Sequence, residues 1–379
     1  MNLAIIQARL GSSRLPGKVL APILGKPMLQ WQLERLKLSR QLSQIAVATS
    51  DRPGDDKIAE FCASQNVPCF RGSESDVLAR FYNSTLQFLG AEQRKNAVIV
   101  RLTGDCPLTD PYMLDEALEQ FKADSARGCR YLGYAEDMPD GLGFEILTWD
   151  ALKEAHENST DPFEREHVTP FHWRNPTRFG AQKFSKKGLL PGLRFSVDHR
   201  EDRDFIEAIL TREVASGKLF TASVLSELVA QDPGLRAINA AVINNEGLFK
   251  TAFASEKYKV EVAGRTLVKY GIALKPESLP NDGFLDWCTS LGINVYAADG
   301  VALAHMTTYV ARHSEKKIQV WEKSHIPKNW RIAAPGADSQ KTLSALADAP
   351  GTQGLLLETS DRHILAEMLT FLCKTRFGL

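Results

Sequence analysis

The chain has 379 residues, 44% of them apolar, and its 46 basic and 46 acidic side chains cancel to a formal net charge of zero. This length allows two domains, and the charge balance excludes a global positive field for nucleic acid or an anionic membrane. Six scattered cysteines, no apolar run near the roughly 20 residues of a membrane span, and too short an apolar start for a signal peptide predict a cytoplasmic protein.

Short apolar runs alternate with amphipathic segments up to about residue 245. The runs predict buried strands at 3–8, 44–49, 97–102 and 193–197. The amphipathic segments predict a helix that begins at Pro27 and further helices at roughly 54–65, 76–89, 111–124 and 201–216. This alternation predicts an α/β domain with a mostly parallel sheet, in which ligands bind beyond the carboxyl ends of the strands.

The first predicted strand runs into the loop RLGSSRLPGK, which is rich in cations and glycine. Gly11 and Gly17 permit close approach of the backbone to a ligand, and Arg9, Arg14 and Lys18 carry enough positive charge to neutralise a triphosphate. The spacing matches neither a Walker loop nor GxGxxG. The alternative for such a loop, taken alone, is a solvated basic turn.

Two aspartates follow predicted strands, Asp105 in RLTGDCPL and Asp198 in LRFSVDHRED. One or two carboxylates together with substrate phosphates are the usual ligands of Mg²⁺. Helix capping is the alternative for Asp105, but Asp110 suits that role better. Glu201 and Asp202 suit the first turn of the next helix, where the helix dipole favours acidic residues.

Two more polar clusters lack a metal-binding pattern. RGSESDVLAR follows a short strand and enters a helix, so that Arg71 and the hydroxyls could contact a base or ribose, although capping by Ser75 or Asp76 explains most of the motif. PDGLGFE and EREHVT could supply substrate contacts or supporting groups. His167 in the latter, taken alone, is more typical of a structural histidine.

Five motifs in order resemble those of the cytidylyltransferases that activate acidic sugars: IIQARLGSSRLPGKVL, RGSESDVLARFY, VRLTGDCPL, EREHVTPF and RFSVDHRED. The resemblance is to the SpsF-type branch, named for spore coat polysaccharide biosynthesis and related to the acylneuraminate and Kdo enzymes. It covers about residues 1–245. It implies a Rossmann-like, glycosyltransferase-A-type nucleotidyltransferase fold, a homodimer, and Mg²⁺-dependent transfer from CTP to an acidic or modified sugar for surface polysaccharide.

The resemblance also assigns residues. The CTP loop would comprise Ala8, Arg9, Leu10, Gly11, Ser12, Arg14 and Lys18. Cytosine and ribose would lie near Arg71, Ser73 and Asp76. Catalysis would depend on Arg9, Lys18, Asp105 and Asp198, of which Asp105 and Asp198 would bind Mg²⁺. The sugar side would comprise Asp140, Glu145, Glu164, Arg165 and His167. Members of this branch have approximately the motif PDGLDxE, whereas this chain has PDGLGFE. Gly143 thus replaces the second aspartate of the motif, and the missing carboxylate is expected to affect sugar specificity or turnover.

Two other functions fit parts of the sequence. A glycosyltransferase that uses a nucleotide-sugar donor would show a DxD-like pair after a central strand, whereas TGDCP has one aspartate there. A non-catalytic nucleotide-binding scaffold would fit Gly143 and the altered C-terminal part. Release of pyrophosphate separates the cytidylyltransferase from both.

A domain boundary is expected near 245–258, followed by a smaller α/β domain over 258–379. LVKYGIA, LGINVYAADGVA, IQVWEKS and QGLLLETSD resemble the opening strands of an aldo/keto reductase barrel. Lys323 matches that pattern, whereas Ala297 replaces its aspartate and Glu358 its histidine. About 120 residues are half of a typical (β/α)₈ barrel, which implies a shortened, catalytically inactive relative that serves assembly or partner binding.

Overall fold

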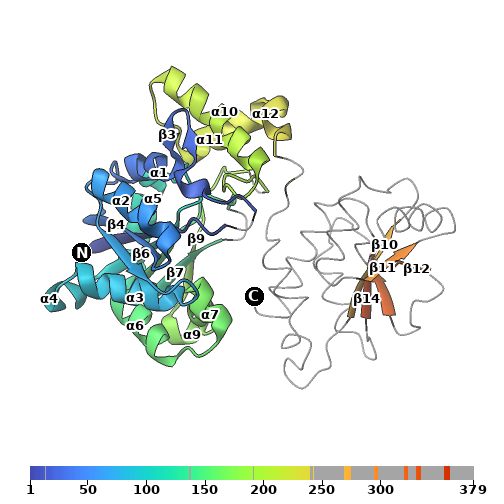
Figure 1. Cartoon of the computed structure of the whole chain (residues 1–379). Helices are drawn as coiled ribbons and strands as arrows, with labels where there is room; N and C mark the ends of the chain where they lie inside the picture. Colours follow the sequence, from blue (N-terminus) through green and yellow to red (C-terminus); the bar gives the residue numbers. More distant parts are fainter. Residues whose placement is uncertain are drawn as a thin grey trace. The chain divides into compact units, whose positions relative to one another are not determined.

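The computed structural model describes residues 1–12, 14–135, 138–190, 192–239 and 242, together with the backbone of five strands between 269 and 358. The chain divides into two compact units, Met1–Val242 and Ile243–Leu379 (Figure 1). The division falls three residues before 245, where the sequence analysis places the start of the boundary. No helix within the described ranges combines the length and apolar character that crossing a membrane requires.

The first unit is built on a seven-stranded sheet. Its strands are β1 (Asn2–Gln7), β4 (Gln44–Ser50), β5 (Cys69–Gly72), β6 (Val98–Thr103), β7 (Tyr131–Tyr134), β8 (Glu145–Thr148) and β9 (Gln182–Phe184). They lie in the order β5-β4-β1-β6-β8-β7-β9. All pairings are parallel except those of β8 with β6 and β7, so the first residue of β8 lies at the same rim as the last residues of the other strands. A small hairpin pairs β2 (Pro22–Ile23) with β3 (Lys26–Pro27).

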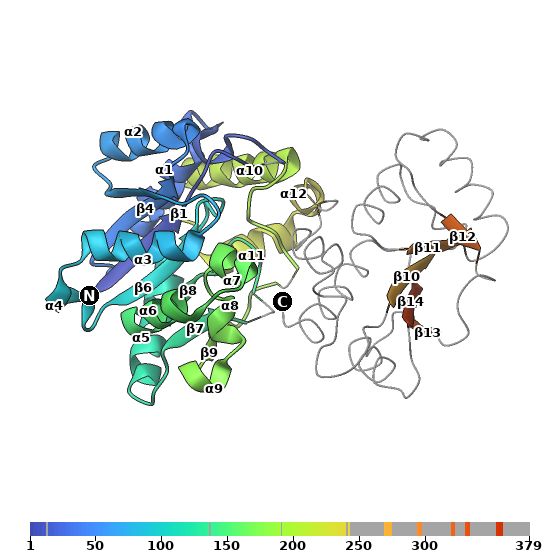
Figure 2. The same ribbon diagram turned by 60° about the horizontal axis from the view of Figure 1, so that its bottom comes forward.

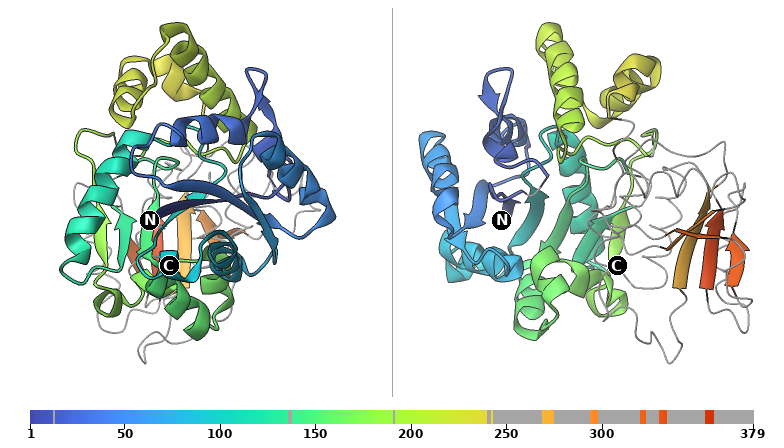
Figure 3. Two further views of the ribbon diagram at one scale, coloured as in Figure 1. Left: turned by 90° about the vertical axis from the view of Figure 1, so that its left-hand side faces the viewer. Right: turned by 45° about the vertical axis from the view of Figure 1, so that its right-hand side comes forward.

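Helices cover both faces of this sheet. They are α1 (Met28–Leu36), α2 (Asp56–Ser64), α3 (Val77–Phe88), α4 (Ala91–Arg94), α5 (Pro111–Ser125), α6 (Trp149–Asn158), α7 (Pro162–His167), α8 (Pro170–Trp173), α9 (Pro176–Phe179), α10 (Arg200–Ser216), α11 (Ala222–Gln231) and α12 (Pro233–Ala237). Short 3₁₀ turns are η1 (Lys18–Leu20) and η2 (Pro53–Asp55). α3, α6, α8 and α9 pack on one face (Figure 2), and α1, α2, α5 and α10 on the other. α10, α11 and α12 lie together at one end of the unit (Figure 3).

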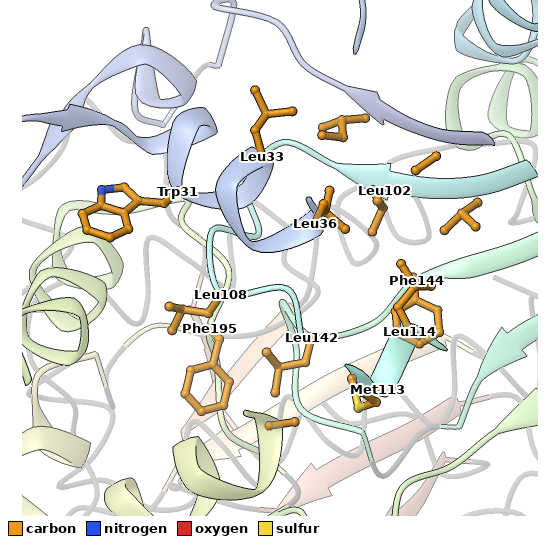
Figure 4. Close-up of a cluster of buried hydrophobic side chains, with 14 of the residues drawn as sticks. Trp31, Leu33, Leu36, Leu102, Leu108, Met113, Leu114, Leu142, Phe144 and Phe195 are labelled. Atoms are coloured by element: carbon orange, nitrogen blue, oxygen red, sulfur yellow. The ribbon is translucent and has the colours of Figure 1, made fainter. Parts of the chain in front are cut away.

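Two buried clusters hold the layers together, one on each face of the sheet. In the larger, Leu36 of α1, Leu102 of β6 and Leu114 of α5 are almost fully buried (Figure 4). Alternate residues of β1 serve the two clusters, Ile6 the larger and Ile5 the smaller, because successive side chains of a strand point to opposite faces. A strand that is apolar on both faces is therefore required at the centre of this sheet.

The α/β class with a mostly parallel sheet is confirmed, and so are most predicted elements. The runs at 3–8, 44–49 and 97–102 form β1, β4 and β6, and the five predicted helices form α1, α2, α3, α5 and α10. Asp110 caps α5 by accepting hydrogen bonds from the amides of Tyr112 and Met113, as predicted. Asp76 caps α3 by accepting one from the amide of Ala79.

The predicted strand at 193–197 is wrong. This segment forms a single-residue bridge between Arg194 and Asp140, and its other backbone bonds go to a loop. The amide of Phe195 donates to the carbonyl oxygen of Asp140 at 2.7 Å, and that of Val197 donates to the carbonyl oxygen of Asp105 at 2.9 Å. Its apolar side chains are buried under α10 instead of within the sheet. Burial of this kind gives the same apolar sequence pattern as a buried strand.

The strand order places a switch point between β1 and β6. From β1 the chain proceeds to β4 and β5 on one side and then returns to β6 on the other. In open α/β sheets, ligands bind beyond the carboxyl ends of the strands at such a point. Gly104 brings the two loops together, since its amide donates to the carbonyl oxygen of Gln7 at 2.8 Å and a Cβ would lie 3.1 Å from the Ala8 side chain.

The second unit contains a five-stranded parallel sheet. Its strands are β10 (Lys269–Leu274), β11 (Asn294–Ala297), β12 (Val320–Glu322), β13 (Trp330–Ala333) and β14 (Gly354–Glu358). The order is β12-β11-β10-β14-β13, so β12 and β13, which follow one another in the chain, form opposite edges. A (β/α)₈ barrel instead closes its strands into a ring. Ala297 and Glu358 end β11 and β14, and Lys323 lies outside the described residues.

Candidate active site

The loop after β1 is closed by hydrogen bonds and directs Lys18 inward. The amide of Leu10 donates to Asp55 Oδ1 at 2.7 Å, and that of Gly17 donates to the carbonyl oxygen of Leu10 at 2.9 Å. Gly17 has φ of 74°, a left-handed conformation that favours glycine. Asp55 is buried and also accepts a hydrogen bond from Ser50. These bonds hold Leu10 and Gly17, on either side of the loop, at the switch point.

Lys18 is the centre of the site. Its ammonium donates to Asp105 Oδ2 at 3.1 Å, to Asp198 Oδ1 at 2.7 Å and to the carbonyl oxygen of Val197 at 2.7 Å. Only 8% of the residue is exposed. The structure thus brings together Lys18, Asp105 and Asp198, which lie far apart in the sequence, as the resemblance implied.

Asp198 reaches this point through a network that the sequence analysis did not assign. Arg194 donates to Asp198 Oδ2 at 2.7 Å, to Asp140 Oδ2 at 2.7 Å and to Asp202 Oδ1 at 3.0 Å. Asp202 also accepts from the backbone amides of Asp198 and His199, both at 3.0 Å. Asp202 lies in the first turn of α10, as the sequence analysis predicts, and its hydrogen bonds fix the position of the Asp198 backbone.

The charges of the cluster stabilise one another. Burial alone would lower the pKa of Lys18, but Asp105 and Asp198 outweigh it and raise that pKa. Burial would raise the pKa of both aspartates, but Lys18 holds the pKa of Asp105 below its ordinary value and, with Arg14, that of Asp198 far below it. Burial, with the charges of Asp105 and Asp198, raises the pKa of Asp140 against the effect of Arg194. Lys18, Asp105 and Asp198 are ionised at neutral pH.

Asp105 and Asp198 fit a divalent cation. Both are ionised and both face the point where the ammonium of Lys18 stands, which shows that this point stabilises positive charge. Carboxylate oxygens, with the nearby carbonyl oxygen of Val197, are the hard ligands that Mg²⁺ prefers. Within the described ranges, no three His, Cys, Asp or Glu side chains gather as a complete ligand set, so phosphate oxygens and water would complete the coordination.

The other residues of the CTP loop lie around this cluster. Arg14 forms an ion pair with Asp198 at 2.9 Å, and Arg9, whose side chain is 43% exposed, lies 3.9 Å from Glu74. Ser12 Oγ accepts a hydrogen bond from the amide of Leu15. Gly11 lies close to Glu74 on the same side as Arg9, since a Cβ there would be 3.5 Å from Glu74 Oε1. Arg9 is thus the more exposed cation, and Arg14 belongs to the carboxylate cluster.

Arg80 of α3 is a cation that the sequence analysis quoted without a role. It is 2% exposed, and its Nη1 donates to the carbonyl oxygen of Ser73 at 3.2 Å. Its Nε has no hydrogen-bond partner among the described residues. Burial and the neighbouring Arg9 lower the pKa of Arg80 to about 10, so it remains charged at neutral pH. Arg9 and Arg80 together give this side of the site positive charge suited to phosphate.

The residues predicted near cytosine and ribose are engaged in local contacts. Arg71 lies in β5 and pairs with Asp56 at 2.6 Å. Ser73 Oγ accepts from the amide of Asp76, which caps α3 and pairs with Arg165 at 2.7 Å. These contacts account for Ser73 and Asp76 as structural residues, and the assignment to the nucleoside stays a prediction.

The predicted sugar residues divide into two groups. Asp140 and Glu145 lie at the rim of the sheet: Asp140 contacts Arg194 and Ser196, and Glu145 forms a buried pair with Arg101. Tyr131 also donates to Glu145.

The other three predicted sugar residues, Glu164, Arg165 and His167, lie on α7. Glu164 is buried and accepts from Ser159 at 2.6 Å and from Arg174 at 3.1 Å, while Arg165 bonds to Asp76. His167 is exposed, and its ring packs on Phe163 with 4.4 Å between ring centroids. Glu164 and Arg165 thus connect the helices of this region, and the structure does not bring them into the described contacts of Lys18, Asp105 and Asp198.

A parallel sheet with a lysine and two aspartates at its switch point is the architecture of an α/β nucleotidyltransferase. The family model described as cytidylyltransferase matches residues 3–215, and the chain belongs to that family. An uncharacterized protein of Methanocaldococcus jannaschii is 39% identical over 53% of this chain and 79% of its own. The spore coat polysaccharide biosynthesis protein SpsF of Bacillus subtilis is 32% identical over 58% of this chain and 92% of its own.

A solved structure supports the same fold. A cytidylyltransferase from Leptospira borgpetersenii matches with a TM-score of 0.56 and 29% identity, over 62% of this chain and 95% of its own. The matched share corresponds in size to the first unit, which carries every residue of the candidate active site.

Proposed function

We propose that this protein is a CTP- and Mg²⁺-dependent cytidylyltransferase that joins CMP to an acidic or modified sugar and releases pyrophosphate, for the synthesis of a surface polysaccharide. The relative SpsF is named for spore coat polysaccharide biosynthesis, which supports the last part of the proposal. Other relatives are named as cytidylyltransferases of 3-deoxy-manno-octulosonate and of its 8-amino-3,8-dideoxy form, which supports a sugar as the acceptor.

The observation that carries the proposal is the position of Lys18 between Asp105 and Asp198 at the switch point. Two ionised carboxylates, one in the loop after β6 and one after the extended segment 193–197, suit a metal-bound triphosphate, and the surrounding cations suit its outer phosphates. A site of this kind needs no covalent nucleophile, because nucleotidyl transfer depends mainly on in-line positioning and on neutralised charge.

The chain's own residues then have distinct tasks. The sugar hydroxyl oxygen attacks the α-phosphorus, the bond from that phosphorus to the bridging oxygen breaks, and pyrophosphate leaves while the hydroxyl proton passes to water. Arg9, Arg14 and Lys18 bind the leaving phosphates and stabilise their charge. Asp105 and Asp198 would hold Mg²⁺, which supplies positive charge at the α-phosphate when bound.

The proposal is tested with purified protein, CTP, Mg²⁺ and single sugars from a panel of 3-deoxy-manno-octulosonate, its 8-amino-3,8-dideoxy form, N-acetylneuraminate and neutral N-acetylhexosamines. We expect pyrophosphate and an equal amount of CMP-sugar with at least one panel member, and none without Mg²⁺. Free nucleoside diphosphate from a nucleotide-sugar donor would indicate a glycosyltransferase. Calorimetric binding of CTP without any product would indicate a scaffold.

A homodimer, which the resemblance implies, and a cytoplasmic location, which the cysteine pattern and the lack of a long apolar run in the sequence predict, are part of the same proposal. Light scattering on the full chain at several concentrations tests the first, with a mass of about 84 kDa expected from twice the 42.0 kDa of one chain. A mass equal to one chain at all concentrations would contradict it.

A further inference from the structure

Tyr134 presents an unusual surface at the rim of the sheet. It is the last residue of β7, and the three residues before it in that strand are buried. Tyr134 itself is 46% exposed, among the most exposed of the large apolar side chains in the described ranges. Since β7 pairs in parallel with β9 and antiparallel with β8, Tyr134 lies at the same rim as the start of β8 at Glu145.

The aromatic ring of Tyr134 lies on the backbone of Gly143. A Cβ added to Gly143 would be 2.9 Å from Tyr134 Cδ1 and 3.0 Å from both Cε1 and Cγ. Three ring atoms at nearly equal distances mean that the ring meets this position with its face. Gly143 does not have a positive φ, so the need for glycine here comes from the ring and not from the backbone conformation.

The charged groups around Tyr134 are already paired. Glu145 forms its buried pair with Arg101, and Asp140 is 2.7 Å from Arg194. The phenol of a tyrosine has a pKa of about 10 and is therefore neutral at neutral pH. The exposed face of the ring is thus an uncharged surface at the rim where Asp140 and Asp198 are joined by Arg194.

We propose that Tyr134, seated on Gly143, determines acceptor specificity by stacking against the C–H face of the sugar ring. This inference rests on the proposed function and deepens it by naming the surface that holds the acceptor. Aromatic side chains offer large apolar area at little cost in conformational entropy, and the C–H face of a sugar matches such a surface. Gly143 is required because any side chain there would push the ring out of place.

The test compares Y134A, Y134F and G143A with the wild-type enzyme in the pyrophosphate assay, using the panel sugar that gives the highest kcat/KM. We expect Y134A to raise the sugar KM about tenfold, the change that follows from about 1.4 kcal/mol of lost binding, with the KM for CTP unchanged. Y134F keeps the ring and should stay within about twofold of wild type. Y112A removes an equally exposed tyrosine from α5 and should change neither KM.

G143A completes a double-mutant cycle with Y134A. Alone it should raise the sugar KM, and in the Y134A background it should have no further effect, because the ring that it displaces is gone. Thermal unfolding of each variant checks that the fold is retained. A sugar KM for Y134A within twofold of wild type, or an equal rise in the KM for CTP, would overturn the inference.

A second measurement separates this inference from the proposed function. If wild type releases no pyrophosphate with any panel sugar, the proposed function fails. The inference is then decided by saturation-transfer difference NMR of the same sugars on wild type and Y134A loaded with CTP. Sugar ring-proton signals that are present for wild type and lost for Y134A support stacking on Tyr134. Equal signals for both proteins, or none for wild type, contradict it.

Discussion

Arg194 Nε donates to Asp202 Oδ1 at 3.0 Å, and Asp202 is completely buried. This pair connects the extended segment before α10 with the first turn of the helix. Because Arg194 also reaches Asp140 and Asp198, the geometry of the active-site carboxylates depends on a contact made behind them. A change at Asp202 therefore affects both stability and activity.

D202N should lower the free energy of unfolding by about 3 kcal/mol, because it removes one partner of a buried ion pair. Both backbone amides donate to the same oxygen, Oδ2, so the oxygen of the new amide can still accept from them. Its NH₂ group then replaces Oδ1 and faces the donors of Arg194 and Asn239. Urea denaturation followed by circular dichroism measures the loss. The control is D204N on the exposed side of the same helix, where the 3.9 Å pair with Arg200 contributes about 0–1 kcal/mol. Equal midpoints for the two variants would contradict this assignment.

D105N should lower kcat by roughly 10²-fold or more at saturating Mg²⁺, by analogy with the loss of one preorganised charge contact. The measurement is pyrophosphate release with the panel sugar that the wild type uses best. D150N, which changes an exposed aspartate in the first turn of α6, should retain normal turnover. Near-normal turnover by D105N would remove Asp105 from the catalytic residues.

G141A should be far more damaging than G188A, although both glycines have φ of +85°. A Cβ at Gly141 would lie 2.2 Å from the amide nitrogen of Ser196 and 2.3 Å from the carbonyl carbon of Phe195, so the bridge beside Asp140 could not form. At Gly188 nothing lies within 4 Å of the added atom. G188A should therefore cost only about 1 kcal/mol for its left-handed backbone, whereas G141A should lose folded, active protein. Similar melting temperatures would disprove the packing argument.

Stability should fall as the pH drops below about 6.5 because of His172. This residue is fully buried, its Nε2 lies 3.1 Å from the carbonyl oxygen of Ala151, and its Nδ1 has no partner in the described part of the chain. Burial lowers its pKa, against the opposing effects of the Ala151 carbonyl and of Glu145, so the unfolded chain binds the proton more tightly. The stability it contributes is present above the unfolded pKa and decreases as pH falls, by up to about 1.4 kcal/mol per pH unit.

H172Q tests this effect, because glutamine does not titrate in this range. Urea midpoints measured between about pH 8 and about pH 5 should fall less steeply for H172Q than for wild type. H156Q, which changes a half-buried histidine stacked on Tyr82, should reduce the slope less. A slope for H172Q equal to that of wild type would exclude His172 as the cause.

The sequence was sufficient to predict the central sheet and the core of the site. Apolar runs and amphipathic spacing located β1, β4, β6 and the main helices, because burial on both faces of a parallel strand leaves a clear pattern. Lys18, Asp105 and Asp198 were found because a glycine-rich basic loop and carboxylates after apolar runs are distinctive chemistry. The strand predicted at 193–197 failed because burial under a helix produces the same apolar pattern.

The parts of the site that the sequence did not predict depend on contacts between distant segments of the chain. Arg194 and Arg80 are unremarkable arginines in the sequence, and only the fold shows that one links three aspartates and the other is buried beside Arg9. Asp55 has no role in the sequence analysis, and the structure shows that it accepts a hydrogen bond from Leu10 in the loop after β1. The relation of Gly143 to Tyr134 spans two strands, so local patterns give no sign of it.

The reversed direction of β8 divides the first unit along the chain. On the proposed function, segments up to Asp105 would supply the basic loop and one carboxylate of the site, whereas segments from Tyr134 onward would supply the acceptor surface together with Asp198. Genetic exchange with a crossover between β6 and β7 would therefore replace the acceptor surface together with Asp198, so a chimera would need an incoming segment with an equivalent carboxylate opposite Lys18.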